Sequence, residues 1–352
     1  MINRRRHNII GFEGNGAECR EWSDLPVNVL DIIAARLDAL DQIYFRAVCK
    51  NWGQTRRFPV TKKLPWLMGH SWACDQNVYS VCSFCRPSAN PSHVPYSKIE
   101  REVFKVLHGA AICASKFGWL LLQKSTFSFF YNPYTKSIIK LPDLDLSFNR
   151  TTFSSVPTSP DCFCFAIQSS KNDVKIYLSI CQPGDNQWST LILDGFRRAV
   201  EDVVFSNGTF YCVFTRGVLG AFRVADQHWS LLTNRNPISR VFFQSRAHMV
   251  DSNGELWLVC PFKGFEVFRF DWSTMTWVKA NTLGCQALFL GCTSLAVSAE
   301  GETSGFAERI YYQYGIYSYC YSMETKQRNQ CALYLPDTTC GTERVWIQPP
   351  EI

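Results

Sequence analysis

The residues best spaced for chemistry are Cys82 and Cys85, a CxxC pair of the kind found in zinc and redox sites. A structural zinc ion needs four ligands, usually from two such pairs. The other candidates, His70, Cys74 and His93, have irregular spacing. A redox pair would lie in a βαβ pattern, and none surrounds these cysteines. Metal binding by the pair stays open, and we assign no metal and no cofactor to the chain.

Catalytic motifs are missing elsewhere in the sequence. There is no G-x-S-x-G, no P-loop and no H-E-x-x-H, and the six histidines are scattered. Asp161, Asp202, Asp226 and Asp271 could form an acidic pocket, but aspartates between strands more often bond to the backbone of their own turn. The sequence therefore favours a binding protein over an enzyme.

Two amphipathic helices are predicted near the N-terminus. Asp24 precedes Pro26 at the start of the first helix, and Asp41 can cap the second. Apolar residues follow the i, i+3, i+4 pattern in both helices. The first stripe contains Val29, Leu30, Ile33 and Leu37, and the second contains Phe45, Val48, Cys49 and Trp52. Two helices in about forty residues cannot bury both stripes alone, so a partner or the rest of the chain must cover them.

The order and spacing of these residues resemble an F-box. An F-box begins with Leu-Pro and ends in Val-Cys-Lys-x-Trp, as residues 25–26 and 48–52 do here. The sequence departs from the pattern at Asn28 and Gly53, neither of which touches the apolar stripes. The resemblance implies a surface that binds a Skp-type adaptor and, through it, a cullin. The implied adaptor-binding residues are Leu25, Pro26, Val29, Leu30, Ile33, Leu37, Val48, Cys49 and Trp52. Without the resemblance, a helical hairpin that only decorates the larger domain would fit equally well.

Composition indicates a globular chain. Of 352 residues, 46% are hydrophobic and 19% charged, and aromatics reach 14%, a share that suits β-strands. The net charge of +6 is mild, and basic residues cluster only at 4–6, 56–57 and 62–63, so we expect no nucleic-acid partner. No secretory signal or membrane-spanning stretch is predicted. We expect a protein of the nucleus, the cytoplasm or both, with its sixteen cysteines reduced.

After residue 60 the pattern changes to short apolar runs separated by turns, and one unit repeats. Asn207-Gly208 and Asn253-Gly254 stand 46 positions apart, each inside a strand–turn–strand–turn–strand pattern that ends at Trp229 or Trp277. Asn-Gly is a strong hairpin signal, because both positions accept positive φ. Four strands per 40–50 residues, repeated, are typical of β-propeller blades. The recurring tryptophans, with Trp188, favour packing between blades over a stacking site for a ligand.

Weaker copies of the unit occupy 110–141, 162–193 and 293–335, and another could begin at 64–85. Five or six blades are therefore expected. Segments such as 131–136 and 204–211 also resemble the kelch-related domain of unknown function that follows the F-box in a large plant family. That resemblance implies a plant protein with a propeller-like fold that selects targets.

The predicted fold is a small three-helix F-box followed by an all-β, kelch-like propeller. The predicted organisation is a flexible tail (1–20), the F-box (21–60), the propeller (61–340) and a C-terminal tail (341–352). We expect a non-catalytic substrate-recognition subunit of a Skp–cullin–F-box ubiquitin ligase that sends its target to degradation. The sequence leaves open a binding protein outside cullin ligases, and a propeller hydrolase or metal enzyme with a site in the central channel. It does not identify the target, a small ligand or the binding face.

Overall fold

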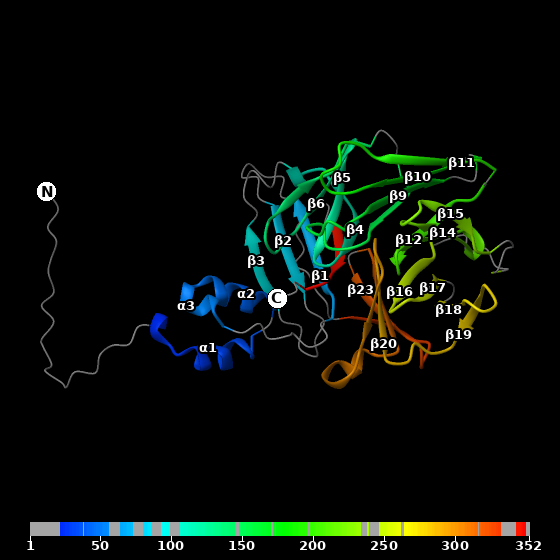
Figure 1. Cartoon of the computed structure of the whole chain (residues 1–352). Coiled ribbons are helices and arrows are strands. Elements are labelled where there is room, and N and C mark those ends of the chain that lie inside the picture. Colours follow the sequence, from blue (N-terminus) through cyan, green and yellow to red (C-terminus); the bar gives the residue numbers. More distant parts are fainter. Residues whose placement is uncertain are drawn as a thin grey trace, which may run out of the picture. The chain divides into compact units, whose positions relative to one another are not determined.

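The computed structural model divides the chain into two compact units, residues 1–60 and 61–351 (Figure 1). The predicted N-terminal tail and the three basic clusters lie outside the described residues. The structure describes residues 22–37, 39–55, 64–72, 80–85, 93–98, 106–144, 148–169, 172, 174–195, 197–233, 238, 246–261, 264–315, 317–331 and 343–349.

The first unit is helical. It contains η1 (Trp22–Asp24), α1 (Val27–Ala34), α2 (Ala39–Ala47) and α3 (Lys50–Gly53). Two details differ from the sequence-based prediction. Asp41 lies inside the first turn of α2 and is not its cap, and Pro26 takes the N-cap position of α1 without a side-chain bond. The second predicted stripe is split, because Cys49 is extended and separates α2 from α3.

The described part of the second unit contains six sheets, which agrees with the larger blade count predicted. The first three sheets contain β1 (Trp66–Trp72), β2 (Ser80–Cys85) and β3 (His93–Lys98) with β25 (Glu343–Ile347); β4 (Ala111–Lys116), β5 (Trp119–Lys124), β6 (Phe127–Tyr131) and β7 (Ile138–Lys140); and β8 (Arg150–Phe153), β9 (Cys164–Ser169), β10 (Ile176–Cys181) and β11 (Ser189–Leu193).

The other three sheets complete the propeller. They contain β12 (Val200–Ser206), β13 (Thr209–Phe214), β14 (Val218–Arg223) and β15 (His228–Leu231); β16 (His248–Ser252), β17 (Glu255–Pro261), β18 (Phe265–Asp271) and β19 (Thr276–Ala280); and β20 (Gln286–Leu290), β21 (Leu295–Ser298), β22 (Arg309–Tyr314), β23 (Tyr317–Ser322) and β24 (Arg328–Gln330). In the last sheet β20 pairs in parallel with β22, after a 3-10 helix, η3 (Gly301–Phe306).

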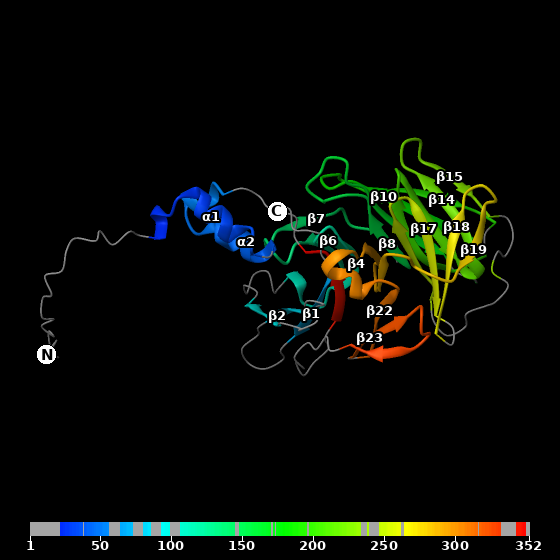
Figure 2. The same ribbon diagram turned by 90° about the horizontal axis from the view of Figure 1, so that it is seen from below.

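The C-terminal strand closes the ring. Residues 343–347, predicted as part of a tail, form β25, which pairs antiparallel with β1 in a register that places Leu67 opposite Trp346. The same strand contacts β4 of the next sheet, and Figure 2 shows it in red between these two strands. Trp346 is buried against Phe289 of the last sheet, with ring centroids 5.0 Å apart. The predicted boundary at residue 340 is therefore wrong, because the first sheet takes its innermost strand from the chain's end.

Apolar clusters lie between adjacent sheets. Phe165 of the third sheet stacks on Phe210 of the fourth at 4.6 Å, and both are fully buried. The predicted role of the tryptophans in packing between blades is confirmed for two of them. The Nε1 of Trp188 donates to Pro142 O of the preceding blade at 2.9 Å, and that of Trp277 donates to Gly217 O at 2.7 Å. Burial of whole strand faces against neighbours holds the blades together.

The two Asn-Gly hairpins form as predicted. They join β12 to β13 and β16 to β17, with φ of 47° and 76° at Asn207 and Gly208. Besides β3 and the C-terminal β25, two inner strands were not predicted. They are β8, whose Arg-Thr-Thr-Phe sequence has no apolar run, and β20, which begins the last sheet at Gln286 rather than Thr293. The local sequence pattern identifies strands that contain apolar runs. It misses strands that form only because a strand distant in sequence pairs with them.

The aspartates divide into two groups. Asp271 accepts from Ser273 N at 2.9 Å within its own turn, as predicted. Asp202 is instead buried on β12 and accepts from Met249 N of the next blade at 2.8 Å. Burial is the main reason that the pKa of Asp202 is raised above its ordinary value. The four residues therefore do not form an acidic pocket.

Cys82 and Cys85 both lie on β2, where about 3.3 Å of rise per residue separates their positions by about 10 Å. Cys74 lies outside the described residues. Over the described ranges, no three His, Cys, Asp or Glu side chains gather as metal ligands would. In that part of the chain, no helix has the length and apolar character to cross a membrane.

Candidate functional site

The helical unit has a very small core. Leu30, Ala34 and Phe45 are its buried apolar residues among those described, and Phe45 lies against Trp52 with ring centroids 4.4 Å apart. Leu25, Ile33, Leu37 and Trp52 pack around them and stay half-buried. Three short helices enclose little volume, so most of their apolar surface must find cover elsewhere.

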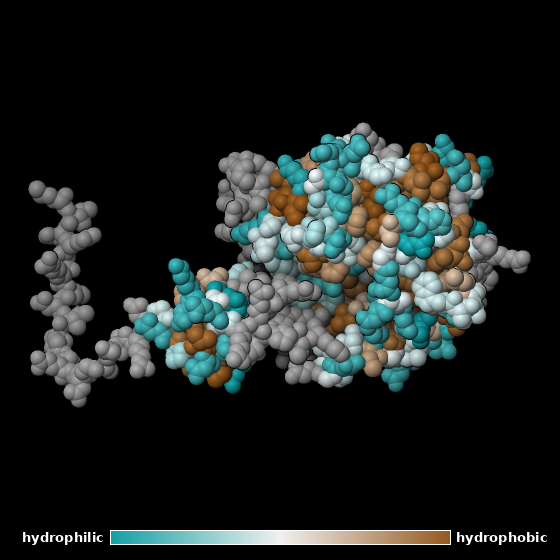
Figure 3. Space-filling model, viewed as in Figure 1, coloured by the Kyte–Doolittle hydropathy of each residue, from teal (hydrophilic) through white to brown (hydrophobic). Residues whose placement is uncertain are grey.

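The outside of this unit is rich in exposed apolar side chains, visible as brown atoms in Figure 3. Ile32 keeps 58% and Val48 keeps 61% of their surface accessible. The other large exposed apolar residues of the unit are Trp22, Val27, Val29 and Tyr44. Six large exposed apolar side chains on so small a unit point to a protein-binding surface. We call these six residues the exposed apolar surface.

Side chains of α3 hold the N-terminal segment in place. The Nδ2 of Asn51 donates to Ser23 O at 2.8 Å and to Leu25 O at 3.1 Å. The Nε1 of Trp52 donates to Trp22 O at 3.1 Å. These bonds fix the Leu25-Pro26 turn beside the last helix. Sequence reasoning missed Asn51, and its polar character in an otherwise apolar motif is the signal that could have found it.

The nine predicted adaptor-binding residues fall into three groups. Pro26, Val29 and Val48 are exposed, and Leu30 is buried in the unit's own core. The half-buried members are Leu25, Ile33, Leu37, Cys49 and Trp52. Leu30 therefore supports the surface from beneath, while the exposed members could contact a partner directly. Adaptor binding by the set stays a prediction.

The exposed apolar surface also includes four residues outside the predicted set: Trp22, Val27, Ile32 and Tyr44. Val27 and Ile32 lie off the predicted stripe of α1, so apolar residues surround much of this helix. An apolar residue on the expected polar face of a short helix is itself a signal of a partner surface.

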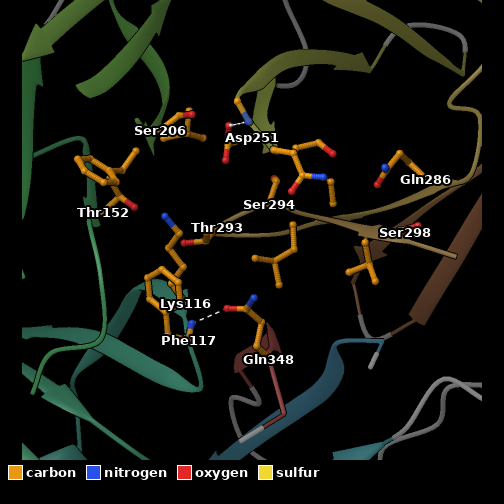
Figure 4. A pocket seen from close by; sticks show the side chains of 18 of the residues that line it. Lys116, Phe117, Thr152, Ser206, Asp251, Gln286, Thr293, Ser294, Ser298 and Gln348 are labelled. Atoms are coloured by element: carbon orange, nitrogen blue, oxygen red, sulfur yellow. Dashed lines mark hydrogen bonds between the residues drawn. The ribbon is translucent and has the colours of Figure 1, made fainter. Parts of the chain in front are cut away.

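A second site lies on the axis of the propeller. A cavity of about 930 Å³ opens there, lined by the ends of the innermost strands (Figure 4). Much of its lining is polar: Thr152, Ser154, Ser206, Asn207, Ser252, Asn253, Gln286, Thr293, Ser294, Ser298 and Gln348. Lys116, Asp251 and Glu300 supply its charged groups. This is the polar axial pocket that a channel enzyme would require, although the metal cluster of a metal enzyme is not found among the described residues.

Two family comparisons bear on these units. The sequence model of the F-box domain matches residues 22–55, and that of the KIB1-4 beta-propeller matches residues 87–334. The second match covers most of the chain. The chain belongs to the KIB1-4 beta-propeller family. Both resemblances drawn from the sequence, an F-box and a plant kelch-like propeller, are confirmed.

Two relatives of this KIB1-4 propeller protein match it over most of their length. F-box protein At3g56470 of Arabidopsis thaliana is 27% identical, with 93% of this chain and 88% of the relative covered. F-box/kelch-repeat protein At1g57790 of the same plant is also 27% identical, with 94% and 95% covered. Among solved structures, the AfRom2 CNH domain matches at 10% identity, with 78% of this chain and 88% of that domain covered. Its TM-score of 0.39 is too low for conclusions about this chain.

Proposed function

We propose that this protein is the substrate-recognition subunit of a Skp–cullin–F-box ubiquitin ligase. Its F-box binds a Skp-type adaptor, which is bound to a cullin, and its propeller binds a target protein. The observation that carries the proposal is the exposed apolar surface of a unit that the F-box model matches. Apolar side chains such as Val48 and Ile32 gain free energy when a partner removes them from water.

The mechanism is proximity. The complex holds a lysine of the target close to a charged ubiquitin-conjugating enzyme, which raises the effective concentration of the two reacting groups. The chain itself supplies no catalytic group to this transfer. The ubiquitinated target is then degraded. We propose that the protein acts in the nucleus, the cytoplasm or both, which imaging of a fluorescent fusion in plant cells would test.

The adaptor test uses substitutions on the exposed apolar surface. Changing Leu25 and Pro26 to Ala should abolish binding, but Leu25 packs against the small core, so this variant could also unfold the unit. Val29→Glu with Val48→Glu avoids that problem, because both side chains are exposed. A charge buried at the interface should weaken adaptor binding at least about a hundredfold.

The matched control is Val278→Glu on β19 of the propeller, a valine whose exposure lies between those of Val29 and Val48. It should bind a purified Skp-type adaptor like the wild type, and circular dichroism should show both proteins folded. Undiminished binding by the Val29/Val48 variant would exclude the adaptor-binding role of this surface.

A binding protein that holds an adaptor but acts outside cullin ligases is the second candidate. It rests on the same surface, so only the composition of the complex separates the two. Co-expression with adaptor and cullin, followed by size-exclusion chromatography, should give a three-protein complex that ubiquitinates captured proteins. A stable pair that leaves cullin free would favour the second candidate.

A further inference from the structure

The axial cavity brings together polar groups from several blades. Lys116 ends β4, Thr152 lies on β8 and Ser206 ends β12. Figure 4 shows the three side chains directed toward the same open space. Because neighbouring blades place the ends of their inner strands around one axis, residues far apart in sequence converge there.

These three side chains have hydrogen-bonding capacity that the protein does not use. Thr152 and Ser206 are largely buried residues, and in the part of the chain that the structure describes neither hydroxyl bonds to the protein, so both are left to face the cavity. The Lys116 ammonium likewise makes no hydrogen bond or ion pair with any described residue. A few polar groups that converge on a pocket and have no partner in the protein are typical of a ligand site.

Lys116 is a cation in confined surroundings. Its Nζ lies 5.0 Å from the ring centroid of Phe117 and 5.8 Å from that of Phe205. Burial lowers the pKa of Lys116 to about 8, while the charges of Asp251 and Cys162 act to raise it. Aromatic faces stabilise the cation only partly. An anion in contact with Nζ would offset more of the hydration free energy that the ammonium loses on burial.

The other charges in the cavity limit which anion fits. Asp251 and Glu300 line the same space, so two carboxylates face one ammonium. The three charges sum to −1 before a ligand binds, and neither carboxylate forms an ion pair with Lys116. A dianion such as a phosphate monoester would therefore be repelled more strongly than a single carboxylate, which gains from direct contact with Nζ and feels the two carboxylates only at longer range. Val204, Phe205 and Leu295 supply apolar wall for the rest of a ligand. The volume of about 930 Å³ is that of a small-molecule site.

We infer that the axial cavity binds a small monocarboxylic acid with an apolar body. Its carboxylate lies against Lys116 and accepts hydrogen bonds from the hydroxyls of Thr152 and Ser206. This inference goes beyond adaptor binding and does not rest on it, because the cavity belongs entirely to the propeller unit.

The test titrates the full chain with three matched probes: phenylacetate, its neutral analogue phenylacetamide and phenyl phosphate. Ligand-observed NMR and calorimetry should give a Kd on the order of 1 mM for phenylacetate, a value usual for so small a ligand. Phenylacetamide should bind at least about tenfold more weakly, since it has no negative charge to pair with the Lys116 ammonium. Phenyl phosphate should also bind more weakly. Equal affinity for all three probes, or no binding of phenylacetate, would overturn the inference.

Substitutions locate the carboxylate. Lys116→Met should weaken phenylacetate at least about tenfold, and Thr152→Val or Ser206→Ala by a few-fold each. Lys140→Met, which removes an exposed lysine of β7, should change nothing. If Lys116→Met and Lys140→Met behave alike, the probe does not bind at the proposed position.

The dependence of affinity on pH gives an independent readout. Only the protonated ammonium holds the carboxylate, so affinity should be constant near pH 7 and fall about tenfold by pH 9. The neighbouring groups that could also titrate are Asp251, Glu300 and Cys162. Lys116→Arg keeps its charge throughout this range, so it should retain affinity and abolish the pH dependence. If that variant keeps the wild-type pH profile, Lys116 is not the group that holds the anion.

Discussion

Val48 of the F-box keeps more than half of its surface in solvent, whereas Val213 and Val259 of the propeller are fully buried. The residue type is the same and the surroundings differ. Three short helices have no second layer to cover them, while each propeller sheet has a neighbour on both sides. The propeller also exposes apolar residues such as Ile192 and Val278, but these lie on outer strands. The comparison indicates that the propeller covers most of its own apolar residues, whereas the F-box needs a partner to cover the apolar side chains that it exposes.

The largest effect is expected where two blades share a core. Phe210→Ala removes a fully buried ring stacked on Phe165 and should lower the free energy of unfolding of the propeller by about 3–5 kcal/mol. Urea denaturation followed by tryptophan fluorescence measures this loss. Because the F-box is a separate compact unit, adaptor binding should persist.

Leu191→Ala is the matched control for that experiment. Leu191 lies on the outer strand β11 and is exposed, so its loss should cost less than about 0.5 kcal/mol. Similar losses for the two variants would mean that the facing surfaces of the blades are not the source of propeller stability.

A smaller effect is expected in how the stability of each unit depends on pH. Burial, together with Arg246 and Arg150, lowers the pKa of His248 from 6.5 to about 3, while residues 22–55 contain no histidine. The unfolded chain takes up this proton as pH falls below 6.5 and the folded chain does not. The propeller should therefore lose about 2 kcal/mol between pH 7.5 and pH 5 from this residue. Urea midpoints at the two pH values measure the loss.

His248→Gln isolates this contribution. Asp202, whose raised pKa acts in the opposite sense, and every other carboxylate are unchanged in the variant. The difference between pH 7.5 and pH 5 should shrink by about 2 kcal/mol in the variant. If wild type and variant lose stability in parallel, His248 is not held neutral by the fold.

The smallest effect is expected in the N-terminal segment of the F-box, which α3 holds in place. Asn51→Ala removes the bonds to Ser23 O and Leu25 O and should destabilise the N-terminal segment by about 1 kcal/mol. Adaptor affinity should fall by about fivefold, because Trp22 and Pro26 are then less well held. Hydrogen exchange and adaptor titration measure the two effects. Lys50→Ala, an exposed residue of the same helix, should have neither effect.

Much of the fold follows from local pattern. Alternating and continuous apolar runs, together with the Asn-Gly pairs, locate the strands of the fourth and fifth blades almost to the residue. Leu25-Pro26 and the sequence from Val48 to Trp52 likewise identify the F-box. These signals are readable because turns and amphipathic stripes depend on neighbours within a few residues.

Tertiary structure decided what depends on distant partners. The pairing of Leu67 with Trp346 joins the two ends of the propeller, and no local feature of residues 343–347 distinguishes such a strand from a tail. The fully buried state of Leu30 beside exposed Val29 follows from how α1 packs on α2. The convergence of Lys116, Thr152 and Ser206 exists only once the ring has closed, since each comes from a different blade. Sequence thus determined the helices and most of the strands, and tertiary packing determined the core, the exposed apolar surface and the cavity.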